Sequence, residues 1–176
     1  MPVTVRFASE VDATLLHDLA AATFALACPP GTSQASIDEF VNTTLSETSF
    51  AGYLADTARD LLIVEVGGVP AGYTMLVSGE TSDPDVAAVL TARPTIELSK
   101  VYVLATSHGA GVGAALMGAT VDAARQRGAA GVWLGVNQFN PRANRFYEKH
   151  GFAVVGHKTF LLGGRYEEDF VRELVL

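Results

Sequence analysis

Hydrophobic and polar residues alternate over residues 3–8, which predicts a short strand, and a helical period follows it. Ser9 precedes this helix as an N-cap, and Asp12 adds negative charge to the first turn. The Cys-Pro-Pro-Gly run at 28–31 ends the helix. Its hydrophobic stripe recurs every three or four residues and consists of Val11, Leu15, Leu19, Thr23 and Leu26.

Two further helical regions precede a change of period. Ser33 or Ser36 opens the first of them, and Phe50–Ala58 forms the second. From Leu61 to Ser78 the pattern becomes two hydrophobic runs around Gly67-Gly68, which is typical of an antiparallel hairpin.

The second half of the chain alternates strands and helices. Residues 79–94 are rich in Ser, Asp, Pro and Thr, and we expect a loop there with a helical turn near Val86–Leu90. Because no repeat or linker interrupts the pattern, the order predicts one α+β domain over residues 1–176. The remaining elements are a strand at 96–104, a helix at 110–127, a strand at 131–136, a helix at 141–150, and strands at 152–162 and 170–176.

Composition excludes several classes of protein. Apolar residues make up 49% of the chain and charged residues 18%, so it can bury a core and is not disordered. The net charge of −7 argues against nucleic acid as a partner, because such binding needs a basic surface. No apolar run reaches the length of a membrane span, so we expect no membrane partner either.

Cys28 is the single cysteine of the chain, and a lone thiol forms no internal disulfide. We interpret it as a small apolar residue at a helix end, because nothing near it in sequence would activate a nucleophile. The first residues, MPVTVRFASEVD, lack the apolar core of a signal peptide. We therefore expect a cytoplasmic protein. The histidines show no spacing typical of a metal site, and no metal is expected.

The stretch VYVLATSHGAGVGAALM joins a strand, a glycine-rich loop and a helix, which together form an anion-binding site. An ATP-type P-loop is excluded, because Ala-Ala-Leu rather than lysine follows Gly113. A dinucleotide fits the loose glycine pattern, but the loop follows a hairpin, and Asn137 stands where an acidic residue is needed. The pyrophosphate of coenzyme A is the third candidate.

Two motifs decide among these ligands. The run His108-Gly109-Ala110-Gly111-Val112-Gly113 resembles the [QR]-x-x-G-x-[GA] signature of the GNAT superfamily of acyl-CoA-dependent N-acetyltransferases, with histidine in place of glutamine or arginine. The later run VNQFNPRANRFYEKHGF resembles a second motif of that family. The C-terminal part, from WLGV to a final F-x-x-G…D run, resembles PaiA-type spermidine/spermine acetyltransferases. The second motif matches at Asn140, Ala143, Tyr147, Gly151 and Phe152.

The resemblance implies the GNAT fold, a central mixed and mostly antiparallel sheet flanked by helices, whose splayed central strands admit the pantetheine arm. It implies acetyl-CoA as cosubstrate, with the N–H of Val103 donating to the oxyanion. Arg142 and Arg145 are further candidates for the phosphates, and Asn140 is either a ligand or only an N-cap before Pro141. The residues implied to bind the cofactor are Val101, Val103, His108, Gly109, Ala110, Gly111, Val112, Gly113, Ala114, Asn140, Ala143 and Tyr147.

Acetyl transfer to an amine needs a base, because an alkylammonium with a pKa of about 10.4 is almost wholly protonated at pH 7. Glu97 is the candidate: it lies six residues before Val103, and even spacing in a strand predicts both side chains on one face. A water chain is the alternative base. The departing thiolate needs an acid, and the resemblance assigns Tyr147 that role, although its ring can also pack beside Phe146 and Phe152.

The sequence thus predicts an N-acetyltransferase that moves an acetyl group from acetyl-CoA to a primary amine by direct attack in a ternary complex. A polyamine is one candidate acceptor; an amino acid, a protein N-terminus or an aminoglycoside are others. A non-catalytic CoA-binding regulatory module is the alternative from another class. A homodimer is left open. The acceptor site is expected in residues 28–58 and 79–94, with a polycation held by Asp38, Glu39, Glu47, Asp83 and Asp85.

Overall fold

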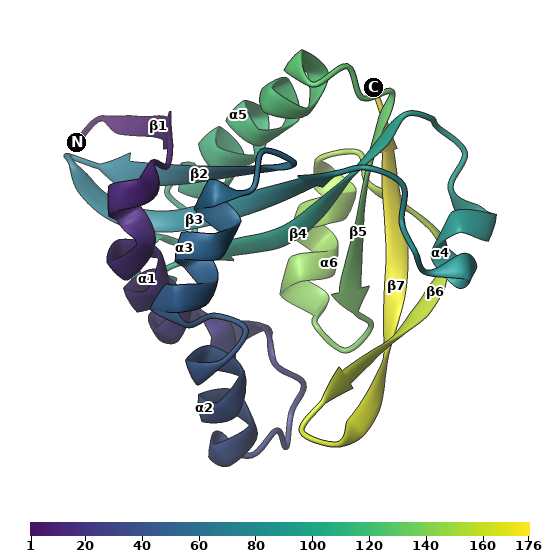
Figure 1. The fold of residues 1–176 in the computed structure, drawn as a ribbon, viewed down its shortest axis with the longest axis horizontal. Helices are drawn as coiled ribbons and strands as arrows, with labels where there is room; N and C mark the ends of the chain where they lie inside the picture. The colour runs from purple at the N-terminus through teal and green to yellow at the C-terminus, as the bar shows by residue number, and fades with distance from the viewer.

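Seven strands form one sheet in the computed structural model, which describes residues 1–176 (Figure 1). The strand order is β1-β2-β3-β4-β5-β7-β6, and only the β4–β5 pair is parallel. The mixed, mostly antiparallel sheet expected from the sequence is therefore confirmed. The strands are β1 Val3–Phe7, β2 Arg59–Val66, β3 Val69–Ser78, β4 Thr95–Val103, β5 Gly131–Asn137, β6 Ala153–Leu162 and β7 Arg165–Val175.

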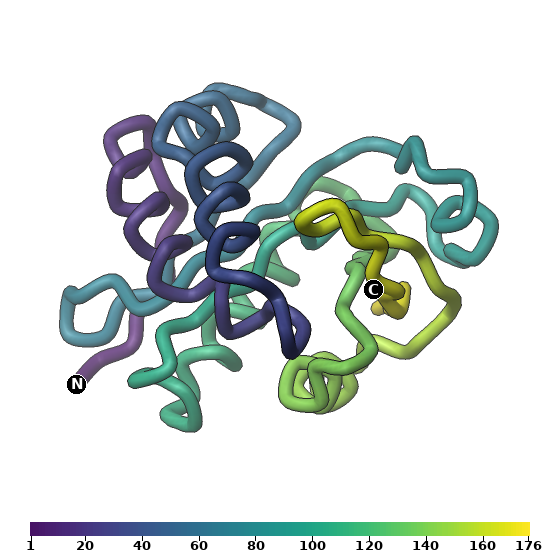
Figure 2. The backbone as a smooth tube through the Cα atoms, turned by 90° about the horizontal axis from the view of Figure 1, so that it is seen from below, coloured from purple at the N-terminus to yellow at the C-terminus, as the bar shows by residue number.

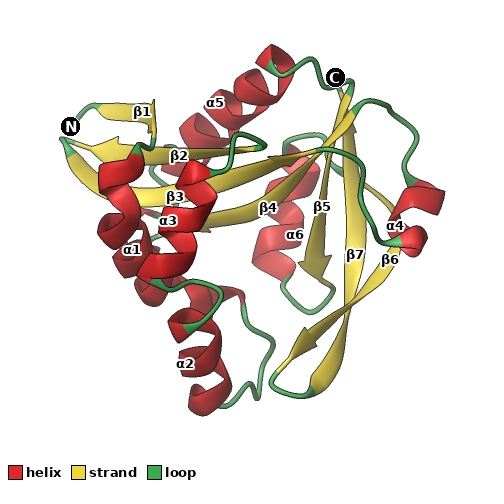
Figure 3. Cartoon of the chain, viewed as in Figure 1, coloured by secondary structure: helices red, strands yellow, loops and turns green.

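Helices cover both faces of this sheet, and each face has its own core (Figures 2 and 3). The first three helices pack on one face, while α5 packs against β1, β2 and β3 on the other. No helix is both long and apolar enough to cross a membrane. The helices are α1 Ala13–Ala27, α2 Gln34–Asn42, α3 Glu47–Ala55, α4 Pro84–Val89, α5 Val112–Gln126 and α6 Pro141–Lys149.

The buried face of α1 differs from the expected stripe. Leu19 and Thr23 of that stripe are buried, but Val11 is 89% exposed and Leu26 is 42% exposed, while Leu16 and Phe24 are buried as well. Val11 lies in a single 3-10 turn at Glu10–Asp12, before the α-helix begins, so it does not follow the helical period.

Other elements begin away from their expected positions for local reasons. The third helix begins at Glu47 rather than Phe50, because the hydroxyl of Ser46 accepts the N–H of Ser49 and so caps it. Strand β7 begins at Arg165 rather than Phe170, because the Gly163-Gly164 turn folds it back along the full length of β6. The hairpin at Gly67-Gly68 and the helix after Asn140 lie where the sequence predicts them.

Strand β4 carries a bulge at Ser99 and parts from β5 beyond Glu97. Met75 faces Lys100 across the β3–β4 ladder and Leu76 faces Leu98, so Ser99 has no partner. On the other edge, pairing with β5 stops at Glu97↔Trp133. The rest of β4 therefore has a free edge, which confirms the splayed central strands.

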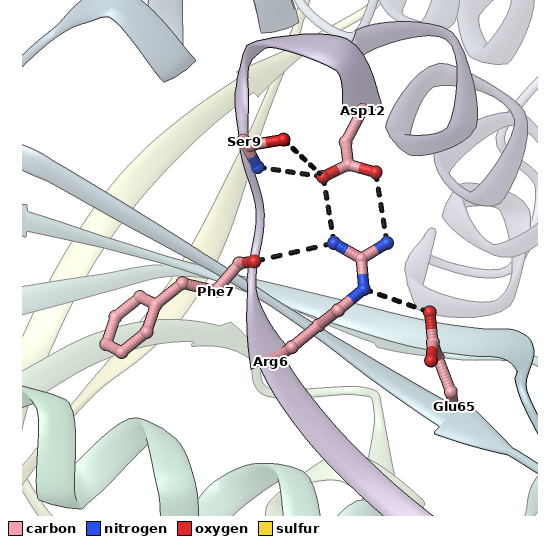
Figure 4. Close-up of polar contacts among 5 residues, drawn as sticks. All are labelled: Arg6, Phe7, Ser9, Asp12 and Glu65. Atoms are coloured by element: carbon pink, nitrogen blue, oxygen red, sulfur yellow. Dashed lines mark hydrogen bonds and ion pairs between the residues drawn. The ribbon is translucent and has the colours of Figure 1, made fainter.

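At the other end of the sheet, Arg6 joins β1 to the start of α1 (Figure 4). Its guanidinium donates to both oxygens of Asp12, at 2.9 and 3.0 Å, and to Glu65 on β2 at 3.0 Å. The backbone N–H of Ser9 donates to Asp12 at 2.8 Å. Asp12 is only 6% exposed, so this carboxylate depends on its donors.

Replacing Arg6 by alanine is expected to lower the free energy of unfolding by about 3 kcal/mol, because it leaves the buried carboxylate of Asp12 without its charged partner. Hydrogen bonds from Arg6 hold the pKa of Asp12 below its ordinary value. The wild type therefore loses this stability as the pH falls below about 4, where the unfolded chain takes up the proton first. Urea unfolding of both proteins from pH 7 to pH 3 checks this.

The control is Arg125→Ala, which breaks an exposed pair with Asp122 and should cost less than about 0.5 kcal/mol. Equal losses in the two variants would contradict the role given to Arg6.

Candidate active site

A cavity of about 720 Å³ opens where β4 and β5 part. Its walls come from the end of α1, the free edge of β4, the glycine loop, α6 and the β6–β7 hairpin. The two faces of the sheet thus meet in one space, because no strand separates them there. Ten of the twelve residues expected to bind the cofactor line it; the side chains of Ala110 and Val112 do not.

The glycine loop presents a row of free donors at the start of α5. Gly109 and Gly111 have φ of +81° and +76°, a conformation that other residues adopt only with strain. An added Cβ at either position would meet nothing within 4 Å, so the space beside them is open. Six consecutive N–H groups, from Gly109 to Ala114, find no acceptor in the protein. With the helix dipole they form a cradle for an anion.

Gly113 serves a different purpose from the other two glycines. A Cβ there would lie 3.2 Å from the ring of Phe146, so glycine allows α6 to approach α5 closely. The helix starts at Val112 rather than Ala110, because Gly111 in the left-handed conformation is its N-cap.

Backbone groups of β4 face the gap at alternate residues. Leu104 donates its N–H to Ala71 on β3, so the N–H groups of Val103 and Val101 point to the opposite, free edge. No β5 residue pairs with them. A ligand that enters the gap meets these donors along its length.

His108 bridges the two sides of the gap. Its Nε2 lies 2.9 Å from the carbonyl of Val103, and its Nδ1 lies 2.7 Å from Nη1 of Arg142 on α6. A neutral ring with its proton on Nε2 satisfies both contacts, since guanidinium only donates. Arg142 is thereby held beside the glycine loop, whereas Arg145 does not line the cavity.

Asn140 caps α6, because its Oδ1 accepts the N–H of Ala143 at 3.1 Å. Its side chain nevertheless lines the cavity, so its role as a ligand stays a prediction.

Tyr147 lies on α6 with its ring against the core and its side chain on the cavity wall. Its ring centroid is 5.6 Å from that of Phe146 and 6.0 Å from that of Phe152. Burial raises the pKa of its hydroxyl, which keeps the proton at neutral pH. The hydroxyl has no hydrogen-bond partner in the protein and is free to donate.

Glu97 and Val103 lie on opposite faces of β4, so the prediction from even spacing was wrong. The bulge at Ser99 adds one residue and inverts the alternation between them. Glu97 therefore shares the face of Lys100, while Val101 and Val103 pack toward α5. Glu97 still reaches the cavity, and burial raises the pKa of its carboxyl despite nearby Lys158, Lys100 and Arg59.

Sequence reasoning missed several charged or phenolic groups of the cavity. Burial raises the pKa of the Tyr102 hydroxyl, and the nearby hydroxyl of Tyr147 raises it further. Asp169 belongs to the F-x-x-G…D run that carried the PaiA resemblance, which was a signal for it. The missed residues are Lys100, Tyr102, Lys149, Lys158 and Asp169.

Of the two segments expected to build the acceptor site, only one lines the cavity. Cys28 and Phe40 line it from residues 28–58, but no residue of 79–94 does, because α4 packs against β6 instead. Burial raises the pKa of Cys28 to about 11, which fits the interpretation of this thiol as an inert apolar residue. None of the five acidic residues expected to hold a polycation lines the cavity: Asp38, Glu39, Glu47, Asp83 and Asp85.

A profile of the acetyltransferase (GNAT) family matches residues 22–152. An uncharacterised N-acetyltransferase of Mycobacterium tuberculosis (strain ATCC 25618 / H37Rv) is 45% identical over 166 residues, which is 93% of this chain and 99% of that protein.

Solved structures share the fold at low identity. The PaiA N-acetyltransferase of Thermoplasma acidophilum, solved in complex with coenzyme A, has a TM-score of 0.79 and 17% identity, with all of both chains covered. A putative acetyltransferase of Salmonella typhimurium, solved with its cofactor acetyl-CoA, has a TM-score of 0.67 and 21% identity. That match covers 100% of this chain and 95% of the other.

Proposed function

This chain belongs to the GNAT acetyltransferase family and is an acyltransferase, and from that membership we propose that it moves an acetyl group from acetyl-CoA to a primary amine. The observation that carries the proposal is the row of six free N–H groups beside a cavity that Glu97 and Tyr147 also line. A polyamine acceptor stays a prediction that rests on the likeness to PaiA.

The residues present fit the parts of coenzyme A. The N–H cradle from Gly109 to Ala114 suits a pyrophosphate, and Arg142 lies beside it. The free edge of β4 offers N–H groups at Val101 and Val103 to an extended arm. Acetyl-CoA, when bound, supplies an activated acetyl group as its thioester.

The reaction needs three actions from the protein. Glu97, directly or through water, accepts the proton of the acceptor's ammonium, so that the neutral nitrogen attacks the carbonyl carbon. An N–H of Val101 or Val103 donates to the oxygen that gains charge. As the C–N bond forms and the C–S bond breaks, Tyr147 gives its proton to the sulfur, and the second proton lost by the nitrogen restores Tyr147 through solvent. One proton leaves to solvent for each amide made.

Thermal unfolding with acetyl-CoA, NAD and ATP, followed by release of free thiol across an amine panel, tests the proposal. Acetyl-CoA at a hundredfold excess over its Kd should add about 2.7 kcal/mol of stability, and the other two should add none. Stabilisation without turnover of any amine would favour the non-catalytic alternative. Stabilisation by NAD and none by acetyl-CoA would reject the proposal outright.

Replacing Glu97 by glutamine is expected to lower kcat about tenfold, a modest loss because water can still carry the proton. Since burial raises the pKa of Glu97, the wild-type kcat should fall with decreasing pH at a value above the ordinary one for glutamate. The variant should lose this acidic limb. Thiol release from pH 5 to pH 9 measures both, with the exposed Glu39→Gln as control. An unchanged limb in Glu97→Gln would remove the carboxylate from the reaction.

A further inference from the structure

Basic side chains are concentrated around the cavity, although the protein as a whole is acidic. The chain contains three lysines, and all three line this cavity: Lys100, Lys149 and Lys158. Two carboxylates, Glu97 and Asp169, line it as well. With Arg142, the cavity is lined by four basic side chains against two carboxylates, although the chain as a whole has a net charge of −7.

Two of the lysines lie away from the glycine loop and form no ion pair. Lys100 shares the face of β4 that packs toward the first three helices, with its ammonium 5.6 Å from the ring centre of Tyr53. Lys158 on β6 has its ammonium 5.9 Å from the ring centre of Phe160. Both side chains are half-buried, and neither donates a hydrogen bond within the protein. Glu97 lies near both lysines and Asp169 lies near Lys158, but neither carboxylate forms an ion pair with them, so two partly desolvated ammonium groups face the cavity without a direct partner.

Asp169 is a carboxylate of the cavity that accepts no hydrogen bond from the protein. It is 7% exposed, and no N–H or O–H of the protein donates to it. Lys158 lies directly opposite it on β6, and both side chains pass over Gly135. A Cβ at Gly135 would lie 3.1 Å from Lys158 and 3.4 Å from the Asp169 carboxylate, so glycine keeps this space open. Burial raises the pKa of Asp169 to about 6. A cation from the ligand would relieve that cost.

From these unpaired charges of both signs we infer that the acceptor is an aminocarboxylate. Its amine lies toward Glu97 and Asp169, and its carboxylate is held by Lys100 and Lys158. This inference rests on the proposed function and narrows its substrate class. A polyamine fits less well, because its second ammonium would meet the two lysines, and like charges at a buried contact repel.

The test compares acceptors that share one carbon chain. Each set contains an ω-amino acid, the alkylamine that lacks its carboxylate, and the diamine that carries an ammonium instead of the carboxylate. The sets run from short to long spacers between the two end groups. Spermidine completes the panel. Thiol release gives kcat/KM for each. The best amino acid should exceed both of its partners about tenfold or more, as one charge-assisted hydrogen bond allows. A diamine or spermidine that equals or exceeds every amino acid would overturn the inference and leave the proposed function standing.

Two variants test whether the lysines cause the preference for an amino acid over its matched alkylamine. Lys158→Met and Lys100→Met should each raise KM for the best amino acid about tenfold and leave that for its matched alkylamine within twofold. Arg125→Gln, at the exposed end of α5, is the control and should change neither. Calorimetric binding of acetyl-CoA shows that each variant retains the cofactor site. An equal loss for both acceptors would overturn the role of the lysines, and no turnover of any acceptor by the wild type would contradict the proposed function itself.

Discussion

Replacing Tyr147 by phenylalanine is expected to lower kcat about a hundredfold or more, which is the usual contribution of a general acid. The variant keeps the ring that packs against Phe146 and Phe152 and removes only the hydroxyl. Because that hydroxyl has no partner in the protein, its removal leaves no buried group unsatisfied. Stability and the Kd of acetyl-CoA should therefore stay the same. Thiol release and calorimetry measure the two effects separately.

Two other tyrosines make this test specific. Tyr166 is 75% exposed, and Tyr166→Phe should have the wild-type rate. Tyr102 lies near Tyr147 in the cavity, but its ring stacks on Tyr73 at 5.6 Å, as a packing residue does. A wild-type rate in Tyr147→Phe together with a large loss in Tyr102→Phe would transfer the role of the acid to Tyr102.

Replacing Gly111 by valine is expected to weaken acetyl-CoA binding about a hundredfold. At φ +76° a β-branched residue costs about 1–2 kcal/mol in that conformation. Its methyl groups would also stand in the open space beside the N–H cradle, where an added Cβ now meets nothing within 4 Å. The loop then either changes its backbone or blocks the anion. Calorimetric titration with acetyl-CoA measures the loss.

The control for that variant is Gly118→Ala, on the exposed side of α5. Gly118 has an ordinary helical backbone and open space around it, so alanine should leave the Kd unchanged and slightly stabilise the helix. A Kd within twofold of the wild type in Gly111→Val would show that the glycine loop is not the phosphate site.

Local signals in the sequence were enough to predict the two elements that bring most of the expected cofactor-binding residues to the cavity. The glycine loop and the Asn140-Pro141 start of α6 are short-range features, and their residues meet in space as expected. The bulge at Ser99 has no comparable signal, because it depends on how β3 pairs with β4. One extra residue was sufficient to place Glu97 on the opposite face from Val103.

The part of the cavity away from the glycine loop depends on contacts between distant segments. Asp169 enters the cavity only because β7 lies between β5 and β6, a strand order that no local pattern reveals. Phe40 of α2 meets Phe160 of β6 edge-on, at 6.1 Å, and lines the cavity from residues 28–58, where part of the acceptor site was expected. The loop 79–94 was expected there but packs behind β6, since α4 buries Val86 against Trp133 and Val171.

The position of the lysines has a practical consequence for chemical labelling. Because every lysine of the chain lines one cavity, an amine-reactive reagent has no other side chain to modify, and only the N-terminus competes. Burial lowers the pKa of Lys100 to about 8. At neutral pH a larger fraction of its amine is therefore neutral and nucleophilic than in a lysine of ordinary pKa. Covalent labelling of the half-buried Lys100 and Lys158, followed by mass spectrometry, therefore reports on cavity occupancy with no need for an engineered tag, and the exposed Lys149 serves as the internal reference.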